Sequence, residues 1–398
     1  MTSPQVESLL GAEAELDVGN VAHGGHCVAR WDGRVVFVRH TLPGERVRVR
    51  ITEGDTGSRF LRGDAVQVLR AAPGRVPAPC PYAGPGRCGG CDFQHVEPWR
   101  QRELLGAVVR EQLSRLAGLD LDVTLEALDP DDLGWRTRMG WTVSSDGRVG
   151  LLRHRSHDVE PVAHCMIAHP RVARPPAVPT DARRLDVAAA ASGERVLLAD
   201  GRLVSGPTRL SERVRGRTLR VSGPTFWQVH PGAAETLVDA VLDLGRPRAG
   251  ERVVDLYAGV GLFSTFLAGA VGTEGSVALV ESDPGALRDA RRNLHDQHQV
   301  TIVAGRVDRV LRSGECGAHA DLVVLDPPRR GARAGVVGSI ASLLPSRVVY
   351  VACDPAALAR DVATFSEHGY ELDTLRAFDL FPMTHHVECV ALLTAGDR

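Results

Sequence analysis

The sequence predicts an α/β protein with a small N-terminal β-barrel, a mixed, β-rich central domain with a cysteine cluster, and a C-terminal Rossmann-like sheet. Three observations lead to this prediction. Short strands separated by glycine turns fill residues 21–70, and a loop rich in proline, glycine and cysteine follows over residues 71–95. From about residue 250, short apolar runs alternate with helical stretches, which is typical of a parallel sheet covered by helices.

The composition excludes several classes of protein. The chain has 398 residues, enough for two or three domains, and it is 43% hydrophobic and 24% charged, as globular proteins are. It contains no apolar run of the ~18–20 residues that a membrane span needs, and its first twenty residues hold four acids and no base. We therefore expect a cytoplasmic protein without a membrane partner. All 47 basic residues are arginines, which excludes Schiff-base lysine chemistry and a P-loop with its GK[ST] motif.

The N-terminal part, expected to span residues 11–70, has the features of a small barrel. The candidate strands are Arg34–Arg39, Glu45–Ile51 and Asp64–Leu69. Residues 21–70 contain nine arginines and five acidic residues, a local balance of +4, after an acidic leader over residues 1–20. A basic barrel is typical of a nucleic-acid-binding module, and a barrel with a merely solvated charged surface is the alternative.

The central part, expected over residues 71–225, mixes a loop, a helix and short strands. Apolar spacing predicts a helix from Pro98 to Ala117, which could pack on the C-terminal domain. Short strands are expected at Met139–Val143 and Val149–Leu152. These elements indicate a mixed or β-rich domain.

Four cysteines in this central part form a candidate metal site. Cys80, Cys88 and Cys91 lie within twelve positions in a proline- and glycine-rich loop, and Cys165 supplies a distant fourth thiol. A CxxC pair with two further cysteines is a metal-ligand pattern. Zinc and an iron–sulfur cluster both accept four thiolates, and the spacing alone favours zinc.

The C-terminal part, expected over residues 226–398, shows repeated buried strands. They are Val253–Tyr257, Val277–Val280, Val300–Val303, Leu322–Leu325 and Val348–Val351. Ligands of open parallel sheets bind beyond the carboxyl ends of the strands, so the residues that follow these runs are the candidate site.

The first two strands of this sheet end in a nucleotide-type pattern. Asp255 is followed by Gly259 and Gly261 at a strand-to-helix turn, and Glu281 ends the next strand, placed to bind ribose hydroxyls. A nicotinamide-binding GxGxxG would need a glycine where Ser264 stands. DxxxGxG with the second acid instead resembles class I S-adenosylmethionine-dependent methyltransferases.

Two later strands supply a nucleophile and a base. Asp326 precedes Pro-Pro, a feature that resembles methyltransferases acting on a base, and Cys353 lies at the end of the fifth strand, before a helix N-terminus that would stabilise its thiolate. Glu388 interrupts an otherwise apolar strand, where an unpaired carboxylate is costly. Uracil C5 becomes nucleophilic only after a thiolate adds at C6, and a base must then remove the C5 proton. Cys353 and Glu388 fit these two roles.

The remaining candidates receive structural interpretations. His385 and His386, next to Glu388, are expected to be polar loop residues rather than ligands. Cys27, Cys316 and Cys389 are expected to be core residues.

Over nearly its whole length the chain resembles the RNA uridine-5-methyltransferases. The resemblance rests on CPYAGPGRCGGCDFQH, GPTFWQVHP, DLYAGVGLFS, ALVESD, LDPPRRG, VACDPAALARD and FPMTHHVECVALL, in this order. It implies that the barrel is a TRAM domain of the OB-like type and that the four cysteines hold a [4Fe–4S] cluster rather than zinc. It also implies Cys353 as nucleophile and Glu388 as base, with methyl-donor contacts at Gln228, Tyr257, Glu281 and Asp326.

The resemblance further implies an RNA substrate. Family members that act on transfer RNA typically lack both barrel and cluster, so 23S ribosomal RNA is favoured and transfer RNA is the alternative. Cytosine C5 methylation is a second enzymatic alternative. An iron–sulfur RNA-binding protein with an inactive methyltransferase domain is a non-enzymatic one. We expect a monomer without an obligate protein partner.

Overall fold

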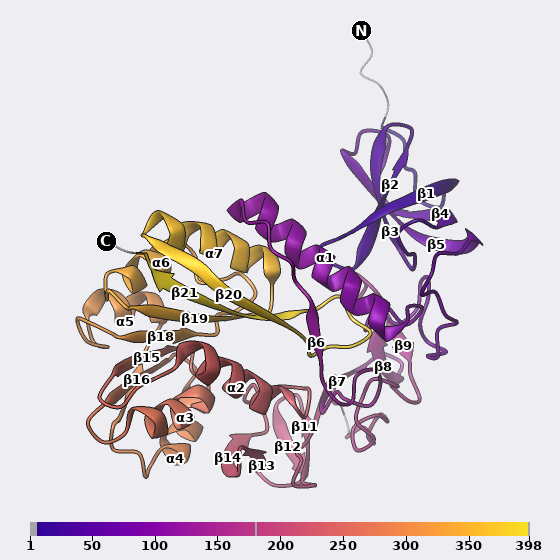
Figure 1. The fold of residues 1–398 in the computed structure, drawn as a ribbon. Coiled ribbons are helices and arrows are strands. Elements are labelled where there is room, and N and C mark those ends of the chain that lie inside the picture. Colours follow the sequence, from indigo (N-terminus) through magenta and orange to yellow (C-terminus); the bar gives the residue numbers. More distant parts are fainter. Residues whose placement is uncertain (1–5, 180, 397–398) are drawn as a thin grey trace.

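The computed structural model describes residues 6–179 and 181–396 of the chain. Five strands at the N-terminus form a closed barrel in the order β1-β2-β3-β5-β4, which projects from one end of the molecule (Figure 1). These strands are β1 (Glu13–Ala22), β2 (His26–Trp31), β3 (Arg34–Arg39), β4 (Arg46–Glu53) and β5 (Phe60–Arg70). The predicted barrel is confirmed.

The acidic leader is part of the barrel, which corrects our expectation that the strands follow it. β1 pairs with β4 in antiparallel register, so that Glu13 lies opposite Arg50 and Glu15 opposite Arg48. Arg50 Nη2 lies 2.8 Å from Glu13 Oε1, and Arg48 Nη2 lies 3.0 Å from Glu15 Oε1. The local balance of +4 therefore overstates the basic character of this surface, because cross-strand acids pair with the arginines of β4.

A long helix, α1 (Pro98–Ala117), spans the predicted range. Pro98 occupies the first turn, where its missing N–H costs nothing, and Gly118 ends the helix in a left-handed conformation with φ +67°. Its buried side includes Leu105, Val109 and Leu113. This side packs against α7 (Pro355–Glu367) of the C-terminal part.

The central part contains an antiparallel sheet in the order β12-β11-β10-β7-β8-β9, beside a two-stranded hairpin, β13-β14. The strands are β7 (Arg138–Val143), β8 (Val149–Leu152), β9 (Val159–Pro161), β10 (Arg184–Ala189), β11 (Arg195–Ala199), β12 (Arg202–Ser205), β13 (Arg209–Val214) and β14 (Arg217–Ser222). Trp135 and Trp141 are fully buried in its core. The expected β-rich character is observed.

The C-terminal part is an eight-stranded sheet in the order β17-β16-β15-β18-β19-β21-β20-β6. Its strands are β6 (Leu125–Ala127), β15 (Arg252–Leu256), β16 (Ser276–Glu281), β17 (Val300–Ala304), β18 (Leu322–Leu325), β19 (Arg347–Ala352), β20 (Tyr370–Asp379) and β21 (Glu388–Ala395). β15 to β19 are parallel, as predicted, and β21 runs antiparallel to its neighbours β19 and β20. β6 comes from the central part of the chain and pairs with β20 at the edge.

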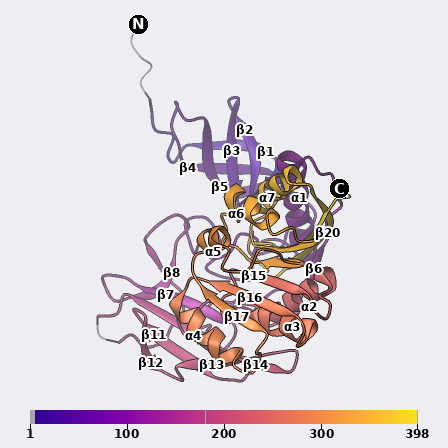
Figure 2. The ribbon, with the colours of Figure 1, turned by 90° about the vertical axis from the view of Figure 1, so that its left-hand side faces the viewer.

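Helices cover both faces of this sheet (Figures 1 and 2). Apolar residues of α1, α5, α6 and α7 share one core with the sheet, and those of α2 and α3 share the other. The remaining helices are α2 (Ala233–Gly245), α3 (Leu262–Val271), α4 (Pro284–Asn293), α5 (Val307–Ser313) and α6 (Ala334–Ala341). Within the described ranges, no helix combines the length and apolarity that crossing a membrane would require.

Candidate active site

A cavity of about 1230 Å³ lies at the carboxyl edge of the parallel strands. It brings together seven residues that the sequence predicted, drawn from the loop before α2 and from the ends of β15, β16, β18, β19 and β21. They are Gln228, Tyr257, Gly259, Glu281, Asp326, Cys353 and Glu388. The predicted Gly261 does not line the cavity. It precedes α3 with φ +86°, and a Cβ there would lie 2.9 Å from Leu294 Cδ1, so its place in the structure is that of a tight turn.

Backbone hydrogen bonds hold the Glu281 carboxylate at the glycine turn. Its Oε2 accepts a hydrogen bond from Gly259 N at 2.9 Å, and its Oε1 accepts from Ser282 N and Asp283 N at 2.5 and 2.6 Å. Charge-assisted bonds of this kind fix an acid in one orientation before any ligand arrives. The acid is therefore preorganised at the mouth of the turn.

Asp255 binds the first turn of α3 and so holds the glycine turn in place, a role that the sequence did not predict. It is fully buried in β15, and its Oδ2 accepts hydrogen bonds from Ser264 N at 2.9 Å and Ser264 Oγ at 2.6 Å. Burial raises the pKa of Asp255 to about 7. Ser264, which breaks the nicotinamide pattern, is thus the partner that ties α3 to β15.

Sheet register places Cys353 and Glu388 at the same edge. β19 and β21 are antiparallel, with Ala352 opposite Cys389. The residue that follows Ala352 and the residue that precedes Cys389 therefore come to the same end of the strand pair. Both Cys353 and Glu388 line the cavity, and Glu388 is only 3% exposed.

Burial raises the pKa of two carboxyl groups and of the thiol in the cavity. Burial, and then the charge of Asp326, raises the pKa of Glu388 well above its usual value. Burial, and then the charge of Asp255, likewise raises the pKa of Asp326. Burial, with further contributions from Glu388 and Asp326, raises the pKa of Cys353 to about 12.

The raised pKa of Cys353 is contrary to the expectation that a helix N-terminus stabilises its thiolate. Asp354, between Cys353 and α7, uses its own carboxylate to accept the hydrogen bond from Ala357 N at 2.8 Å. The carboxylate of Asp354, rather than the Cys353 thiol, therefore interacts with the N-terminus of α7. Burial of the thiol, and then the nearby Glu388 and Asp326, raise the pKa of Cys353 instead.

The cavity includes residues that sequence reasoning passed over. His386, expected to be an ordinary loop residue, lines the cavity, and its Nε2 lies 3.3 Å from Arg329 Nη2. Phe226 is 72% exposed at the cavity wall. Arg329 follows the Pro-Pro pair and Phe226 lies two residues before Gln228, so proximity to recognised motifs was the available signal.

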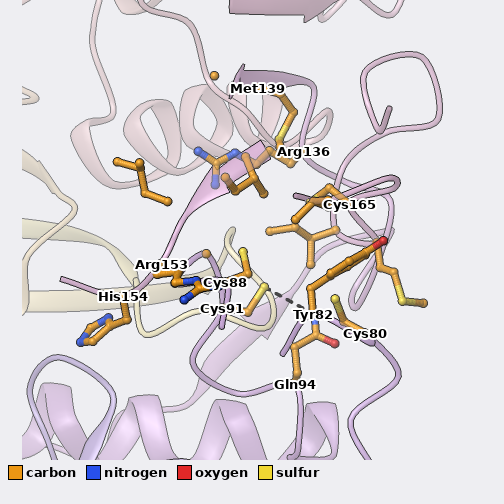
Figure 3. Close-up of a pocket in the computed structure, with 18 of the residues that line it drawn as sticks. Cys80, Tyr82, Cys88, Cys91, Gln94, Arg136, Met139, Arg153, His154 and Cys165 are labelled. Atoms are coloured by element: carbon orange, nitrogen blue, oxygen red, sulfur yellow. Dashed lines mark hydrogen bonds between the residues drawn. The ribbon is translucent and has the colours of Figure 1, made fainter. Parts of the chain in front are cut away.

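A second cavity, of about 300 Å³, gathers the four cysteines of the predicted metal site. Cys80, Cys88, Cys91 and Cys165 all line it, together with Tyr82 and Gln94, as Figure 3 shows. Gln94 Nε2 donates a hydrogen bond to Cys91 Sγ at 3.4 Å. Burial raises the pKa of Cys91, and the neighbouring thiols Cys165, Cys88 and Cys80 raise it further.

The four cysteines share one cavity, but the structure does not group them as metal ligands. In the described part of the chain, no three His, Cys, Asp or Glu side chains are grouped as they would be around one metal ion. This finding supports neither the zinc site that spacing alone favours nor the [4Fe–4S] cluster that the resemblance implies.

Comparisons with known proteins agree with this architecture. Residues 7–66 match the family described as "TRAM domain", and residues 311–396 match "tRNA (Uracil-5-)-methyltransferase". The fold resembles that of the Pyrococcus abyssi tRNA (uracil-54, C5)-methyltransferase in complex with S-adenosyl-L-homocysteine, with a TM-score of 0.72 and 21% identity. The match covers 96% of this chain and 100% of that one.

Curated relatives match along the whole chain. An uncharacterized RNA methyltransferase of Streptomyces avermitilis is 48% identical, over 96% of this chain and 98% of the relative. One of Streptomyces coelicolor is 49% identical, over 97% of this chain and 93% of the relative. With its barrel, its sheet and its C-terminal motifs, the chain belongs to the uracil-5 family of RNA methyltransferases.

Proposed function

We propose that this protein transfers a methyl group from S-adenosylmethionine to C5 of a uridine in RNA through a covalent adduct with Cys353. The observation that carries the proposal is the meeting of a thiol and a buried carboxyl, Cys353 and Glu388, in one cavity with the glycine turn of β15. The cavity of about 1230 Å³ has room for a nucleoside-sized donor and a flipped-out base together.

Cys353 starts the reaction as a nucleophile. Its Sγ forms a bond to C6 of the uracil, and the electron pair of the C5=C6 double bond moves into the C4 carbonyl as an enolate, which makes C5 nucleophilic. S-adenosylmethionine supplies the methyl group to C5 and leaves as S-adenosylhomocysteine. Because burial raises the pKa of Cys353 to about 12 in the free protein, the thiol must release its proton to the solvent before Sγ can attack.

Glu388 completes the reaction as a general base. It removes the proton from C5, and the returning electrons restore the C5=C6 bond and expel Cys353 as the thiolate. Glu388 must be ionised to accept this proton. Burial raises its pKa, so that the carboxylate, once it has released its own proton to the solvent, is a stronger proton acceptor. The balance is one methyl group gained by the RNA and one proton released.

The donor would bind along the ends of the first strands. Glu281, held by three backbone N–H groups, is placed to accept hydrogen bonds from ribose hydroxyls. Gln228, Tyr257 and Asp326 line the same cavity and are assigned further donor contacts. Gly259 allows close approach of the backbone, and Gly261 contributes through the shape of the turn.

We further propose that the second cavity holds a [4Fe–4S] cluster. Cys80, Cys88, Cys91 and Cys165 would be its ligands, and their chemistry fits because four thiols converge on one cavity. Methyl transfer needs no electrons, so the cluster would serve structure or RNA shape.

A cysteine substitution tests whether the second cavity holds the cluster. Cys88→Ser should lose iron, measured by metal analysis of the purified protein, whereas Cys316→Ser, at a buried cysteine outside the cavity, should keep it. A Cys88→Ser protein with full iron content would contradict the assignment.

The favoured substrate is 23S ribosomal RNA, because a barrel and the four cysteines proposed to hold a cluster accompany the methyltransferase domain. The Pyrococcus protein that shares this fold is named for a transfer RNA, which makes transfer RNA the second candidate. The test combines purified protein, labelled S-adenosylmethionine and unmodified transcripts of both RNAs, followed by nucleoside analysis. Label in 5-methyluridine of 23S RNA alone is the expected result, and label in transfer RNA would correct the substrate.

The covalent mechanism has its own test. An RNA containing 5-fluorouridine should trap the protein, because fluorine at C5 cannot leave as a proton does. The trapped complex should be absent with Cys353→Ala. A Cys353→Ala protein that still methylates RNA would overturn the mechanism. Absence of label in both RNAs while the donor binds would favour an RNA-binding protein with an inactive methyltransferase domain, or another RNA as the substrate.

A further inference from the structure

The turn between β1 and β2 of the barrel contacts the segments that carry both proposed catalytic residues. This turn, residues 23–25, contains His23 and Gly25. His23 Nε2 lies 3.1 Å from Asp354 Oδ2, and Asp354 directly follows Cys353. Gly25 lies against His385, which precedes Glu388 by three positions. The sequence predicts RNA binding for the barrel and predicts neither of these contacts.

On the Cys353 side, Asp354 is held at both carboxylate oxygens. Oδ1 accepts the hydrogen bond from Ala357 N at 2.8 Å in the first turn of α7, and Oδ2 faces His23 of the barrel. The residue beside the nucleophile is therefore fixed between its own helix and the barrel. Without His23, one oxygen of Asp354 loses its protein partner, and the turn at residues 353–354 keeps only the contact to α7.

On the Glu388 side, the contact is one of close packing and shared hydrogen bonds. Gly25 has φ +77°, and a Cβ at this position would lie 2.6 Å from His385 Cβ and 3.2 Å from Asp92 Cβ. Asp92 Oδ2 lies 2.6 Å from His385 Nδ1 and accepts from His385 N at 3.1 Å. Arg39 of β3 reaches Asp92 Oδ1 at 3.5 Å. Two barrel residues, Gly25 and Arg39, thus contact the Asp92–His385 pair that holds the segment before Glu388.

We propose that the β1–β2 turn is a positioning element of the active site, in which His23 and Gly25 fix the Cys353 and Glu388 segments relative to each other. This proposal rests on the proposed roles of Cys353 and Glu388. In it, the barrel acts on the rate of the chemical step and not only on affinity for RNA. A positional error of the order of 1 Å between reacting groups can cost ~10²-fold in rate, so loss of one such contact should be measurable.

The experiment measures kcat and KM for RNA with the full-length protein. His23→Ala should lower kcat about ten-fold, a loss within the range expected for misplaced groups, while KM for RNA changes less than two-fold. His23→Gln, whose side-chain amide can still donate to Asp354, should recover most of the rate. Gly25→Ala, which places a methyl group against His385, should lower kcat in the same way.

A matched control separates this effect from RNA binding. Arg48→Ala removes a barrel arginine whose ion pair, to Glu15, lies within the barrel, and it should leave kcat unchanged. Thermal unfolding shows whether each variant is folded. If Gly25→Ala does not fold, the comparison of His23→Ala with His23→Gln still tests the proposal.

A His23→Ala protein with an unchanged kcat would overturn the proposal, whether or not its KM for RNA has risen. Failure of the proposed function is distinguishable, because it would show as methylation by Cys353→Ala. An inactive Cys353→Ala beside a fully active His23→Ala would remove the positioning role alone.

Discussion

Burial of Glu388 has a consequence for stability that follows from its pKa. A carboxyl with a raised pKa stays protonated in the folded protein at pH values where the unfolded chain, with a pKa of about 4.3, has ionised. The folded state then binds more protons than the unfolded state, so its stability falls as the pH rises between these two pKa values. The glutamate is retained at the cost of stability, as expected for a functional residue.

For Glu388→Gln we expect a free energy of unfolding that exceeds the wild-type value by an amount that grows from pH 5 to pH 8. The slope should be at most about 1.4 kcal/mol per pH unit. Urea unfolding across this pH range measures it. Glu371→Gln, at an exposed position of β20, is the control and should show a constant difference. A constant difference for Glu388→Gln as well would contradict the raised pKa.

The Cys353 thiol predicts how the rate depends on pH. With a pKa of about 12, its thiolate fraction increases ten-fold per pH unit through the neutral range. Under single turnover with saturating RNA and donor, the methylation rate should therefore rise from pH 6.5 to pH 8.5. A rate that is constant over this range would show that substrate binding alone removes the thiol proton.

Among the elements, α7 does more than cover the sheet, because Asp361 holds the loop after the Pro-Pro pair. Its Oδ2 accepts hydrogen bonds from Ala332 N and Tyr350 Oη, both at 2.7 Å, and its Oδ1 accepts from Arg333 N at 3.1 Å. One carboxylate therefore joins α7, β19 and the loop that follows Arg329. The position of this loop at the cavity depends on a residue that does not line it.

Asp361→Ala leaves Tyr350 Oη and Arg333 N without their acceptor, and Ala332 N keeps only its longer bond to Tyr350 Oη at 3.2 Å. We expect a loss of at least about 2 kcal/mol in the free energy of unfolding, since unsatisfied buried donors cost about 1–3 kcal/mol each. We also expect a lower kcat, because the Arg329 loop loses its anchor. Thr364→Ala, in the same helix, removes only a bond to Arg360 O and should stay within about 0.5 kcal/mol of wild type. Equal effects of the two substitutions would contradict the anchoring role.

At the scale of the whole molecule, elements from the central part of the chain complete the C-terminal sheet. α1 packs on α7, and β6 pairs with β20, although both lie before residue 225. The division into residues 11–70, 71–225 and 226–398 stays a prediction, and the contacts of α1 and β6 bear on it directly. A fragment of the last part alone would expose the apolar surface that α1 covers.

Two fragments test this arrangement. Residues 226–398 alone should aggregate or bind a hydrophobic dye, because Leu105, Val109 and Leu113 of α1 no longer cover α7. Residues 72–398, which keep α1 and β6, should remain in solution. Size-exclusion chromatography and dye fluorescence distinguish the two. A well-folded, monomeric 226–398 fragment would support the predicted boundary.

Much of this protein followed from the sequence, because local patterns report local structure. The range of α1 was predictable from Pro98 and from the spacing of its apolar residues, and the five parallel strands from their continuous apolar runs. The residues that gather at the cavity were predictable because strands of a parallel sheet end at one edge. Acidic β1 was missed, since its partners lie on β4, some thirty-five residues away in the chain.

Only the tertiary structure decided the state of the site and its connections. Burial raises the pKa of Cys353 most, and Glu388 and Asp326, from distant strands, raise it further. The contacts of His23 and Gly25 with the catalytic segments join residues more than three hundred positions apart. Periodicity describes which side chains share a face of one element. Burial and charge at a point depend on every element that meets there, and the folded chain alone specifies them.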